Sequence, residues 1–600
     1  RGFNAYFLMT EVGPEVDPLS PENKLIFSMG PITGAPISGS GRSSVGAKSP
    51  LTGGYGEGDV GGFFGAELKH AGFDAIICEG RAPKPVYLWI HDGQAEVRDA
   101  THLWGLNTLE SQEAIRAELG DRRIRTAQIG PAGENMVRVA CVINDLKHAA
   151  GRTGMGAVMG SKNLKAVACR ATKNLMTMAD PAPVTKHARW IGENYLTVTR
   201  HFYDLGTANG LLTLNANGGL PTRNFQTGVF EGAANISGEA MRDTILVDRE
   251  NCFACVVRCK RAVKVDKNGY RADPAYGGPE YETLGSLGSC CGVGDLAAVA
   301  HANQLCNAYS LDTIGTGTTI AWAMECFERG ILTTEDTDGI ELRFGNADAM
   351  IAMVEKMARR EGFGNVLAEG VARAARVVGK GSIEFAMQVK GQELPMHEPR
   401  IKQGLGVGYA LSPTGADHMH NIHDTTMSPG PAMDRVRAMG LNIPPLKFND
   451  IGPDKMAFYT ASVNWRSVNN CIGMCNFLPY GFDGTVEILK GVTGWSTNVY
   501  EMMVVGERTN TMLRAYNALN GITAKDDTLP KRFFEQPGDP KPTTDPLDEK
   551  EFWAAKQFYY KAMGWTEGMM KMTLFRARRR LRLMLDRYVR DGKAGEDEKI

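Results

Sequence analysis

Three cysteines, Cys252, Cys255 and Cys259, form the strongest chemical signal in the chain. Their C-x2-C-x3-C spacing lets three thiolates converge on one centre within about two helical turns of chain, so a fourth ligand must come from elsewhere. Such sets hold iron–sulfur clusters, although a structural zinc knot uses the same ligands. The reverse order, C-x3-C-x2-C, is typical of radical enzymes that use S-adenosylmethionine. Two remote residues, Cys471 and Cys475, are candidates for the fourth ligand.

Two groups of proton-transferring residues follow the cysteine motif. Glu280 and Glu282 flank a tyrosine, where they supply either a general base or a pair of surface carboxylates. Three of the 11 histidines, His418, His420 and His423, fall within six residues. They predict either a zinc or non-haem iron site or one proton-transferring histidine beside two structural ones.

Two arginines lie in glycine-rich loops, Arg42 in SGSGRSS and Arg152 in GRTG. Glycine lets backbone N–H groups approach a phosphate, and arginine binds one through two hydrogen bonds. Neither loop is a Walker A motif or a dinucleotide fingerprint. They therefore predict either phosphate binding or simple turns.

The elements that must position these residues change character along the chain. Short β-type runs at 74–78 and 86–90 lie in a stretch rich in glycine and proline. From about residue 180 the apolar positions keep a helical spacing, as at Leu296, Val299 and Cys306. We predict an α+β fold with a β-rich cofactor-binding domain followed by two largely helical domains.

The length of 600 residues predicts several domains, which we place at 1–175, 176–388 and 389–600. The basic segment 576–585 predicts a solvated helix face or a subunit contact. A formal net charge of -1 indicates neither a nucleic-acid nor a membrane-surface partner. No apolar run is long enough to span a bilayer, and no export signal is visible. Most cysteines stand singly in apolar stretches, which indicates a reducing, cytoplasmic location.

Ordered segments over nearly the whole chain resemble the tungsten-dependent aldehyde ferredoxin oxidoreductase family. They are DPLSPENKLI at 17–26, GAELK at 65–69, IGPAGEN at 129–135, GAVMGSKNLK at 156–165, PTRNFQTG at 221–228, the Cys252 motif, GPEYET at 278–283 and DDTLPKR at 526–532. Long ordered agreement is more specific than any single motif. The family normally begins with about two short strands, so we expect further residues ahead of Arg1.

The resemblance implies a tungsten atom held by two pterin cofactors without a protein ligand, so molybdenum remains an alternative. The [4Fe–4S] ligands it implies are Cys252, Cys255, Cys259 and Cys475. Cys475 ends the family's D-x-x-G-L-C pterin motif, which here covers Asn470, Gly473 and Met474. The companion D-x-x-G-L-D motif falls on Asn307, Ser310, Leu311 and Asp312.

Both pterin motifs depart from the family pattern. Asn307 and Asn470 replace the leading aspartate, and Ser310 replaces glycine. An asparagine carbonyl still accepts a hydrogen bond from a pterin amine, but without charge. We therefore expect pterin binding to survive with altered polarity.

The resemblance also implies roles for other residues. Glu282 and His418 match the active-site glutamate and histidine, and Arg42 matches an arginine between cluster and pterin. A Mg²⁺ that bridges the pterin phosphates through backbone carbonyls would lie at Asp59 and near Arg152. The E-x-x-H pair of an iron between subunits falls on His301 and Gln304, which argues against such an iron.

The implied activity is oxidation of an aldehyde to a carboxylic acid at a cofactor between the domains. Electrons would leave singly through the cluster to ferredoxin, or to separate iron–sulfur and flavin subunits, in an oligomeric assembly. One alternative is a relative that reduces an aromatic ring carried on a thioester, although GPEYET at 278–283 resembles the aldehyde branch. The other alternative is a non-enzymatic zinc-knot protein.

Overall fold

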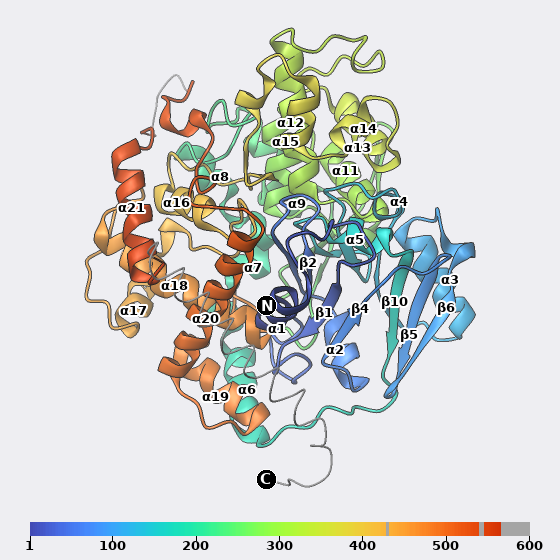
Figure 1. Ribbon diagram of the computed structural model, residues 1–600, viewed down its shortest axis with the longest axis vertical. Helices are drawn as coiled ribbons and strands as arrows, with labels where there is room; N and C mark the ends of the chain where they lie inside the picture. The colour runs from blue at the N-terminus through green and yellow to red at the C-terminus, as the bar shows by residue number, and fades with distance from the viewer. Residues whose placement is uncertain (428–430, 539–544, 566–600) are drawn as a thin grey trace.

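The computed structural model describes residues 1–427, 431–538 and 545–565, so the predicted basic segment 576–585 lies outside the described residues (Figure 1). Two sheets account for the strands from β1 (Leu25–Met29) to β10 (Leu164–Arg170). Helices dominate the rest of the chain, where the strands occur only in two-stranded pairs. Figure 1 shows the blue strands gathered on one side and the helices covering the other. This arrangement confirms the α+β prediction.

The first sheet has the order β3-β2-β1-β4 and is antiparallel throughout. Its other strands are β2 (Ser43–Lys48), β3 (Tyr55–Val60) and β4 (Ala75–Cys78). Strand β2 pairs with β3 so that Ser44 lies opposite Asp59. Because Arg42 comes just before β2, this register brings Arg42 and Asp59 to the same end of the sheet.

The second sheet has the order β6-β5-β10-β7-β8-β9. Its further strands are β5 (Val86–His91), β6 (Gln94–Asp99), β7 (Arg125–Gln128), β8 (Val142–Asn144) and β9 (His148–Ala150). One apolar core, which includes Phe27, Val60 and Val167, joins the two sheets. Strands β4 and β5 confirm the two predicted β-type runs.

Helix ends, rather than helix interiors, carry both of the predicted pterin motifs. Helix α11 (Leu296–Tyr309) ends at Ser310, whose φ of 64° is left-handed, and α12 (Thr313–Glu328) begins directly after Asp312. The departure from glycine at Ser310 has a local compensation, because its Oγ accepts a hydrogen bond from the Gly130 N–H at 2.9 Å. Helix α18 (Pro453–Ile472) ends at Gly473, where φ is 84°.

Helix α20 (Val499–Leu519) packs against α18 and against α1 (Gly2–Glu11), and so connects the helical part to the first sheet. The Asn517 side chain on α20 accepts a hydrogen bond from the Tyr55 N–H at 2.8 Å. In the described part of the chain, no single helix has the length and hydropathy to cross a membrane. One pair bent by 119°, Tyr281–Cys291 with Leu296–Tyr309, meets that test jointly by length and composition.

Candidate functional site

The cysteine loop 252–259 docks on the first sheet through backbone contacts. Phe253 N–H donates to the Gly62 carbonyl at 3.0 Å, and Val256 N–H donates to Ser38 Oγ at 3.1 Å. Two non-glycine residues of the loop, Ala254 and Arg258, adopt left-handed backbone angles. Such angles are costly, so the surrounding contacts must hold the loop in this shape.

Cys475 reaches the same place from the far end of the chain. Its N–H donates to the Gly39 carbonyl at 3.0 Å, so the segment 38–42 touches both the cysteine loop and the second motif. Burial raises the pKa of Cys475, an effect opposed by the positive charge of Arg42 and reinforced by Cys252. Burial also raises the pKa of Cys255 to about 12, again reinforced by Cys252 and Cys475. The fold therefore gathers the remote cysteine with the C-x2-C-x3-C motif.

The spacing of these four thiols differs from a zinc site. Among the described residues, no three of their sulfur atoms lie within 4.8 Å of one another. A tetrahedral zinc site with Zn–S bonds of about 2.3 Å holds its sulfurs about 3.8 Å apart. Cys471 takes no part in the group, because its Sγ instead lies 3.6 Å from Thr509 Oγ1.

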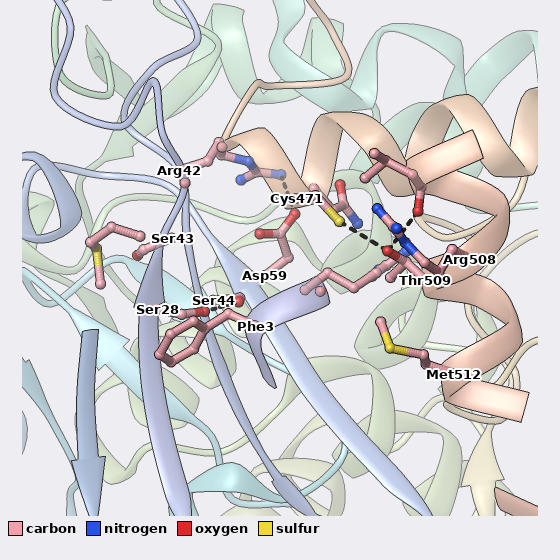
Figure 2. A pocket seen from close by; sticks show the side chains of 17 residues that line it. Phe3, Ser28, Arg42, Ser43, Ser44, Asp59, Cys471, Arg508, Thr509 and Met512 are labelled. Atoms are coloured by element: carbon pink, nitrogen blue, oxygen red, sulfur yellow. Dashed lines mark hydrogen bonds and ion pairs between the residues drawn. The ribbon is translucent and has the colours of Figure 1, made fainter. Parts of the chain in front are cut away.

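A cavity of about 240 Å³ lies beside this cysteine group (Figure 2). Figure 2 shows Arg42 and Asp59 from the first sheet facing Cys471, Arg508 and Thr509 from the helices. Arg42 Nη2 lies 3.9 Å from Asp59 Oδ2, while Arg42 Nε is buried without a hydrogen-bond partner among the described residues. Such an unsatisfied donor is costly unless a ligand accepts from it.

Gly473 and Asn470 also line this cavity, and Met474 follows them as a buried residue against Gly39. Asn470 keeps its side-chain oxygen occupied, because Asn476 Nδ2 donates to it at 3.3 Å. The motif position that departs from aspartate is thus tied to a neighbouring amide. Asn470 therefore lines the cavity as a neutral residue, where an aspartate would add a negative charge.

Replacing Gly473 by alanine is expected to destabilise this end of α18 and to lower the cofactor content. The φ of 84° strains any L-residue by about 1–2 kcal/mol, and the new Cβ would lie 2.4 Å from Thr33 Oγ1. Gly521→Ala is the matched control, because Gly521 has φ 83° with nothing within 4 Å of a Cβ. The melting temperature and the metal content of both variants check this. Equal losses in the two variants would contradict a specific packing role for Gly473.

Arg152, Leu311 and Asp312 form a second polar group. Arg152 Nε lies 3.5 Å from Asp312 Oδ2, and its Nη1 donates to the Ala416 carbonyl at 2.6 Å. Asp312 caps α12 by accepting from the Gly315 N–H at 2.9 Å, and its buried position raises its pKa although Arg152 opposes this. Leu311 pairs with Ala140 in an isolated β-bridge.

Asn307 does not join this second group through any hydrogen bond between their side chains. Its side-chain Nδ2 donates to the Tyr276 carbonyl at 2.9 Å, and its backbone carbonyl accepts from Thr108 Oγ1 at 3.0 Å. The Thr108 contact ties α11 to the β-rich part of the chain. In the first predicted pterin motif, the last residue, Asp312, therefore pairs with Arg152, whereas the first residue, Asn307, makes a structural contact with Tyr276.

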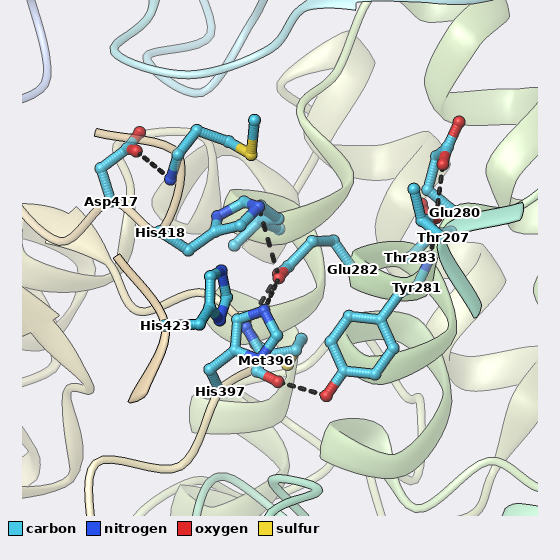
Figure 3. A network of polar contacts seen from close by, with 12 residues as sticks. Thr207, Glu280, Tyr281, Glu282, Thr283, Met396, His397, Asp417, His418 and His423 are labelled. Carbon is cyan, nitrogen blue, oxygen red and sulfur yellow. Dashed lines mark hydrogen bonds and ion pairs between the residues drawn. The ribbon is translucent and has the colours of Figure 1, made fainter. Parts of the chain in front are cut away.

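A buried cluster surrounds the Glu282 carboxylate (Figure 3). Glu282 lies on the short helix α10 (Tyr281–Thr283), which runs into the π-helical turn Leu284–Gly288. Its Oε2 accepts from the Met396 N–H at 2.8 Å. Its Oε1 lies 3.2 Å from His397 Nε2 and 3.6 Å from His418 Nε2. Figure 3 shows the carboxylate between the two rings.

The other members of the two predicted groups point elsewhere. Glu280 pairs with Lys260 Nζ at 2.5 Å and accepts from Thr207. His420 is turned toward Glu57, with Nε2 at 3.7 Å from Oε2, and its Nδ1 lies 3.1 Å from Thr414 Oγ1. Only His418 and His423 of the three clustered histidines therefore face the Glu282 side. Within the described residues His418 Nδ1 is buried without a hydrogen-bond partner, and Glu282 Oε1, also buried, has only its ion-pair contacts with the two imidazoles.

His397 and Lys402 are the residues that sequence reasoning missed. His397 stacks on Tyr281, with ring centroids 5.0 Å apart, and burial together with Lys402 and His418 holds its pKa well below the usual range. Lys402 Nζ lies 3.2 Å from His397 Nδ1. Ligand atoms of Glu282, His397 and His418 converge within 4.8 Å, but the adjacent lysine charge opposes a bound cation. We read the cluster as proton-handling.

His301 and Gln304 are engaged within the subunit. His301 Nδ1 lies 2.6 Å from the Arg271 carbonyl, and Gln304 accepts from the Asp273 N–H at 2.6 Å. Both side chains therefore contact the adjacent hairpin.

Comparison with known proteins gives consistent relatives. The family described as "Aldehyde ferredoxin oxidoreductase, N-terminal domain" matches residues 1–171, and "domains 2 & 3" of the same family match residues 184–577. The tungsten-containing aldehyde ferredoxin oxidoreductases of Pyrococcus abyssi and Pyrococcus furiosus are 40% identical over 579 and 583 residues. Each match covers 94% of this chain and 91% of the relative.

Two more distant similarities broaden this picture. The aliphatic sulfonate oxidoreductase, WOR-like subunit, of Pyrococcus furiosus is 30% identical over 602 residues, covering 94% of this chain and 90% of the relative. The active site complex BamBC of benzoyl coenzyme A reductase aligns with a TM-score of 0.77 at 24% identity. That alignment covers 94% of this chain and 90% of the other, and it shows a shared fold.

Proposed function

The chain belongs to the aldehyde ferredoxin oxidoreductase family, and from this premise we propose that it oxidises an aldehyde to a carboxylic acid beside Glu282. It is an oxidoreductase, which excludes the zinc-knot alternative. One observation carries the proposal: the half-buried Glu282 carboxylate turns its buried Oε1 toward two imidazoles. Identity of 40% to relatives named for aldehydes, against 30% to the one named for sulfonates, favours an aldehyde substrate.

The cofactor we propose is a tungsten or molybdenum bis-pterin held between the β-rich and helical parts of the chain. Arg42, Asp59, Asn470, Gly473 and Met474 would hold one pterin, and Arg152, Leu311 and Asp312 the other, with Asn307 supporting the second. The buried Arg42 Nε, which has no hydrogen-bond partner among the described residues, fits an anionic group such as a phosphate. Backbone carbonyls near Asp59 and Arg152 would bind the bridging Mg²⁺. When bound, the group supplies two-electron oxidation.

The side chains of the cluster would handle protons. Aldehyde and water give the carboxylic acid, two protons and two electrons. We assign Glu282 as the general base that takes a proton from water or from the hydrated aldehyde through Oε1. His418 would donate from Nδ1, its ring nitrogen without a hydrogen-bond partner among the described residues, to the carbonyl oxygen and so polarise it. The stacked Tyr281 and His397 would hold the carboxylate in place and exclude water.

Cys252, Cys255, Cys259 and Cys475 would hold a [4Fe–4S] cluster that carries the electrons away one at a time. We propose ferredoxin, or separate iron–sulfur and flavin subunits, as the acceptor, and an oligomeric assembly. None of the twelve cysteines forms a disulfide, which fits a reducing cytoplasm.

Elemental analysis of anaerobically purified protein tests the cofactor assignment. We expect tungsten or molybdenum with iron and sulfide, because relatives named as tungsten-containing are 40% identical over 94% of the chain. Zinc alone would contradict the cofactor proposal.

An assay panel with a viologen dye as acceptor tests the substrate class. We expect oxidation of acetaldehyde or benzaldehyde, because the residues around Glu282 can activate water for addition to a carbonyl. Turnover of an aromatic acyl-thioester or an aliphatic sulfonate, without aldehyde oxidation, would overturn the aldehyde proposal.

A further inference from the structure

Lys402 is a buried lysine behind the histidines, and the proposed reaction gives it no part. It lies directly before helix α16 (Gln403–Leu411) and its side chain is enclosed. Its Nζ lies 3.2 Å from His397 Nδ1 and 3.2 Å from His423 Nδ1. Since His397 Nε2 faces Glu282, Lys402 stands one imidazole ring away from the carboxylate.

The hydrogen-bonding capacity of an ammonium group restricts both rings. It has three donors and no acceptor, so a ring nitrogen beside it must be the one without hydrogen. Each neutral histidine then carries its hydrogen on Nε2. For His397 this Nε2–H faces Glu282 Oε1 at 3.2 Å.

We infer that Lys402 is a positioning residue for Glu282 and acts through His397. Its ammonium form selects the Nε2–H tautomer of His397, and this tautomer keeps Glu282 ionised and oriented. The inference rests on the proposed function, in which Glu282 must be a carboxylate in order to accept a proton.

The His397 ring is fixed well enough to transmit such a choice. It stacks on Tyr281 at an interplanar angle of 22°, and its backbone carbonyl accepts from Tyr409 OH at 3.4 Å. The His423 ring packs edge-on against it, with centroids 4.4 Å apart. Because the ring cannot turn, Nε2 faces Glu282 in both tautomers. The tautomer alone then decides whether that nitrogen carries a hydrogen to donate.

The charged groups around Lys402 allow it to act on the rings. Asp424 and Glu282 are the negative charges that favour its ammonium form. Asp424 is occupied elsewhere, because Oδ1 accepts from Lys455 Nζ at 2.6 Å and Oδ2 accepts from the Leu405 N–H at 3.0 Å. The Lys402 donors are thus left to the two imidazoles.

Of the remaining charged groups near Lys402, Arg466 acts on His423 in the same direction as the ammonium group does. Glu398 and Arg400, on the preceding loop, pair with each other at 2.8 Å. His418 lies beyond His397, with ring centroids 5.5 Å apart. Burial lowers the pKa of Lys402 to about 8, so the group is charged at neutral pH and loses its charge just above it.

The inference predicts an alkaline limb in the pH profile of kcat/KM. Above about pH 8 the neutral amine can accept from an Nδ1–H, so the other tautomer of His397 becomes allowed. Its bare Nε2 would then face the carboxylate as a second acceptor, and the contact with Glu282 would become repulsive. Activity should therefore fall as the pH rises through that value.

The test compares Lys402→Arg and Lys402→Met in the holoenzyme, with acetaldehyde and a viologen dye. Arginine stays charged, so Lys402→Arg should keep the acid limb and lose the alkaline limb. Methionine removes the donor and the charge, so Lys402→Met should displace the acid limb to higher pH and lower kcat/KM about tenfold below it.

A spectroscopic readout separates this role from a merely structural one. The infrared difference between wild type and Glu282→Gln reports the protonated carboxyl of Glu282, and in Lys402→Met that band should persist to higher pH. Lys165→Met is the matched control, because Lys165 is equally buried but pairs with Glu134 in the β-rich part. Its pH profile should match wild type.

The outcomes distinguish the two levels of proposal. Wild-type pH profiles in both Lys402 variants, with an unchanged infrared titration, would overturn the role of Lys402 even if Glu282→Gln is inactive. Full activity of Glu282→Gln would instead overturn the general-base assignment itself. If Lys402→Met does not fold, the persistence of the alkaline limb in Lys402→Arg overturns the inference by itself.

Discussion

The variant Glu282→Gln is expected to lose aldehyde oxidation while it keeps its tungsten and iron. Glutamine preserves the size of the side chain and an acceptor for the Met396 N–H, but it cannot take a proton. A positioned general base contributes about 10²–10⁴-fold to the rate, so kcat should fall by that factor. Steady-state kinetics with acetaldehyde, together with metal analysis of the same preparation, measure both parts.

Glu280→Gln is the matched control for this result. It makes the same chemical change two residues away, at a carboxylate that pairs with Lys260 rather than with a histidine. We expect it to lower the melting temperature, because an ion pair is lost, and to change kcat only a few fold. Equal losses of kcat in the two variants would indicate general damage to the loop and contradict the assignment of Glu282.

The variant Cys475→Ala is expected to lose the iron–sulfur cluster and with it electron transfer to any acceptor. Three ligands would remain on the loop 252–259. The backbone of residue 475 could still bond to Gly39, but its side chain would no longer supply the fourth thiolate. Since even indirect ligand supports cost 10–100-fold when removed, we expect at least a 100-fold fall in turnover. Iron content and the electron paramagnetic resonance signal of the reduced protein provide the measurement.

Cys471→Ser tests whether the assignment of the fourth ligand is specific. Cys471 lies on the last turn of α18, and its Sγ contacts Thr509 Oγ1 at 3.6 Å. The serine variant should retain iron and the resonance signal of wild type. Loss of iron in Cys471→Ser, with retention in Cys475→Ala, would exchange the roles of the two cysteines.

Several features of this protein follow from local sequence and could be predicted. The spacing of Cys252, Cys255 and Cys259 indicates a thiolate site because eight residues of chain suffice to bring the three together. The strands at 75–78 and 86–91 follow from short apolar β-branched runs, since their formation depends mostly on local patterning. Local patterns offered Glu282, His418 and Cys475 only beside the alternatives Glu280, His420, His423 and Cys471, and resemblance to a family then chose among them.

Only the tertiary structure decided which groups surround Glu282. His397 carries no motif, and the Glu282 carboxylate meets its neighbour Met396 across 114 residues of chain. Glu280 and Glu282 look alike in sequence, yet one faces Lys260 and the other faces two imidazoles. Residue types and spacing along the chain determine local geometry. Which nitrogen of His397 carries a hydrogen depends instead on the packing of separate elements, because this packing places Lys402 Nζ beside Nδ1.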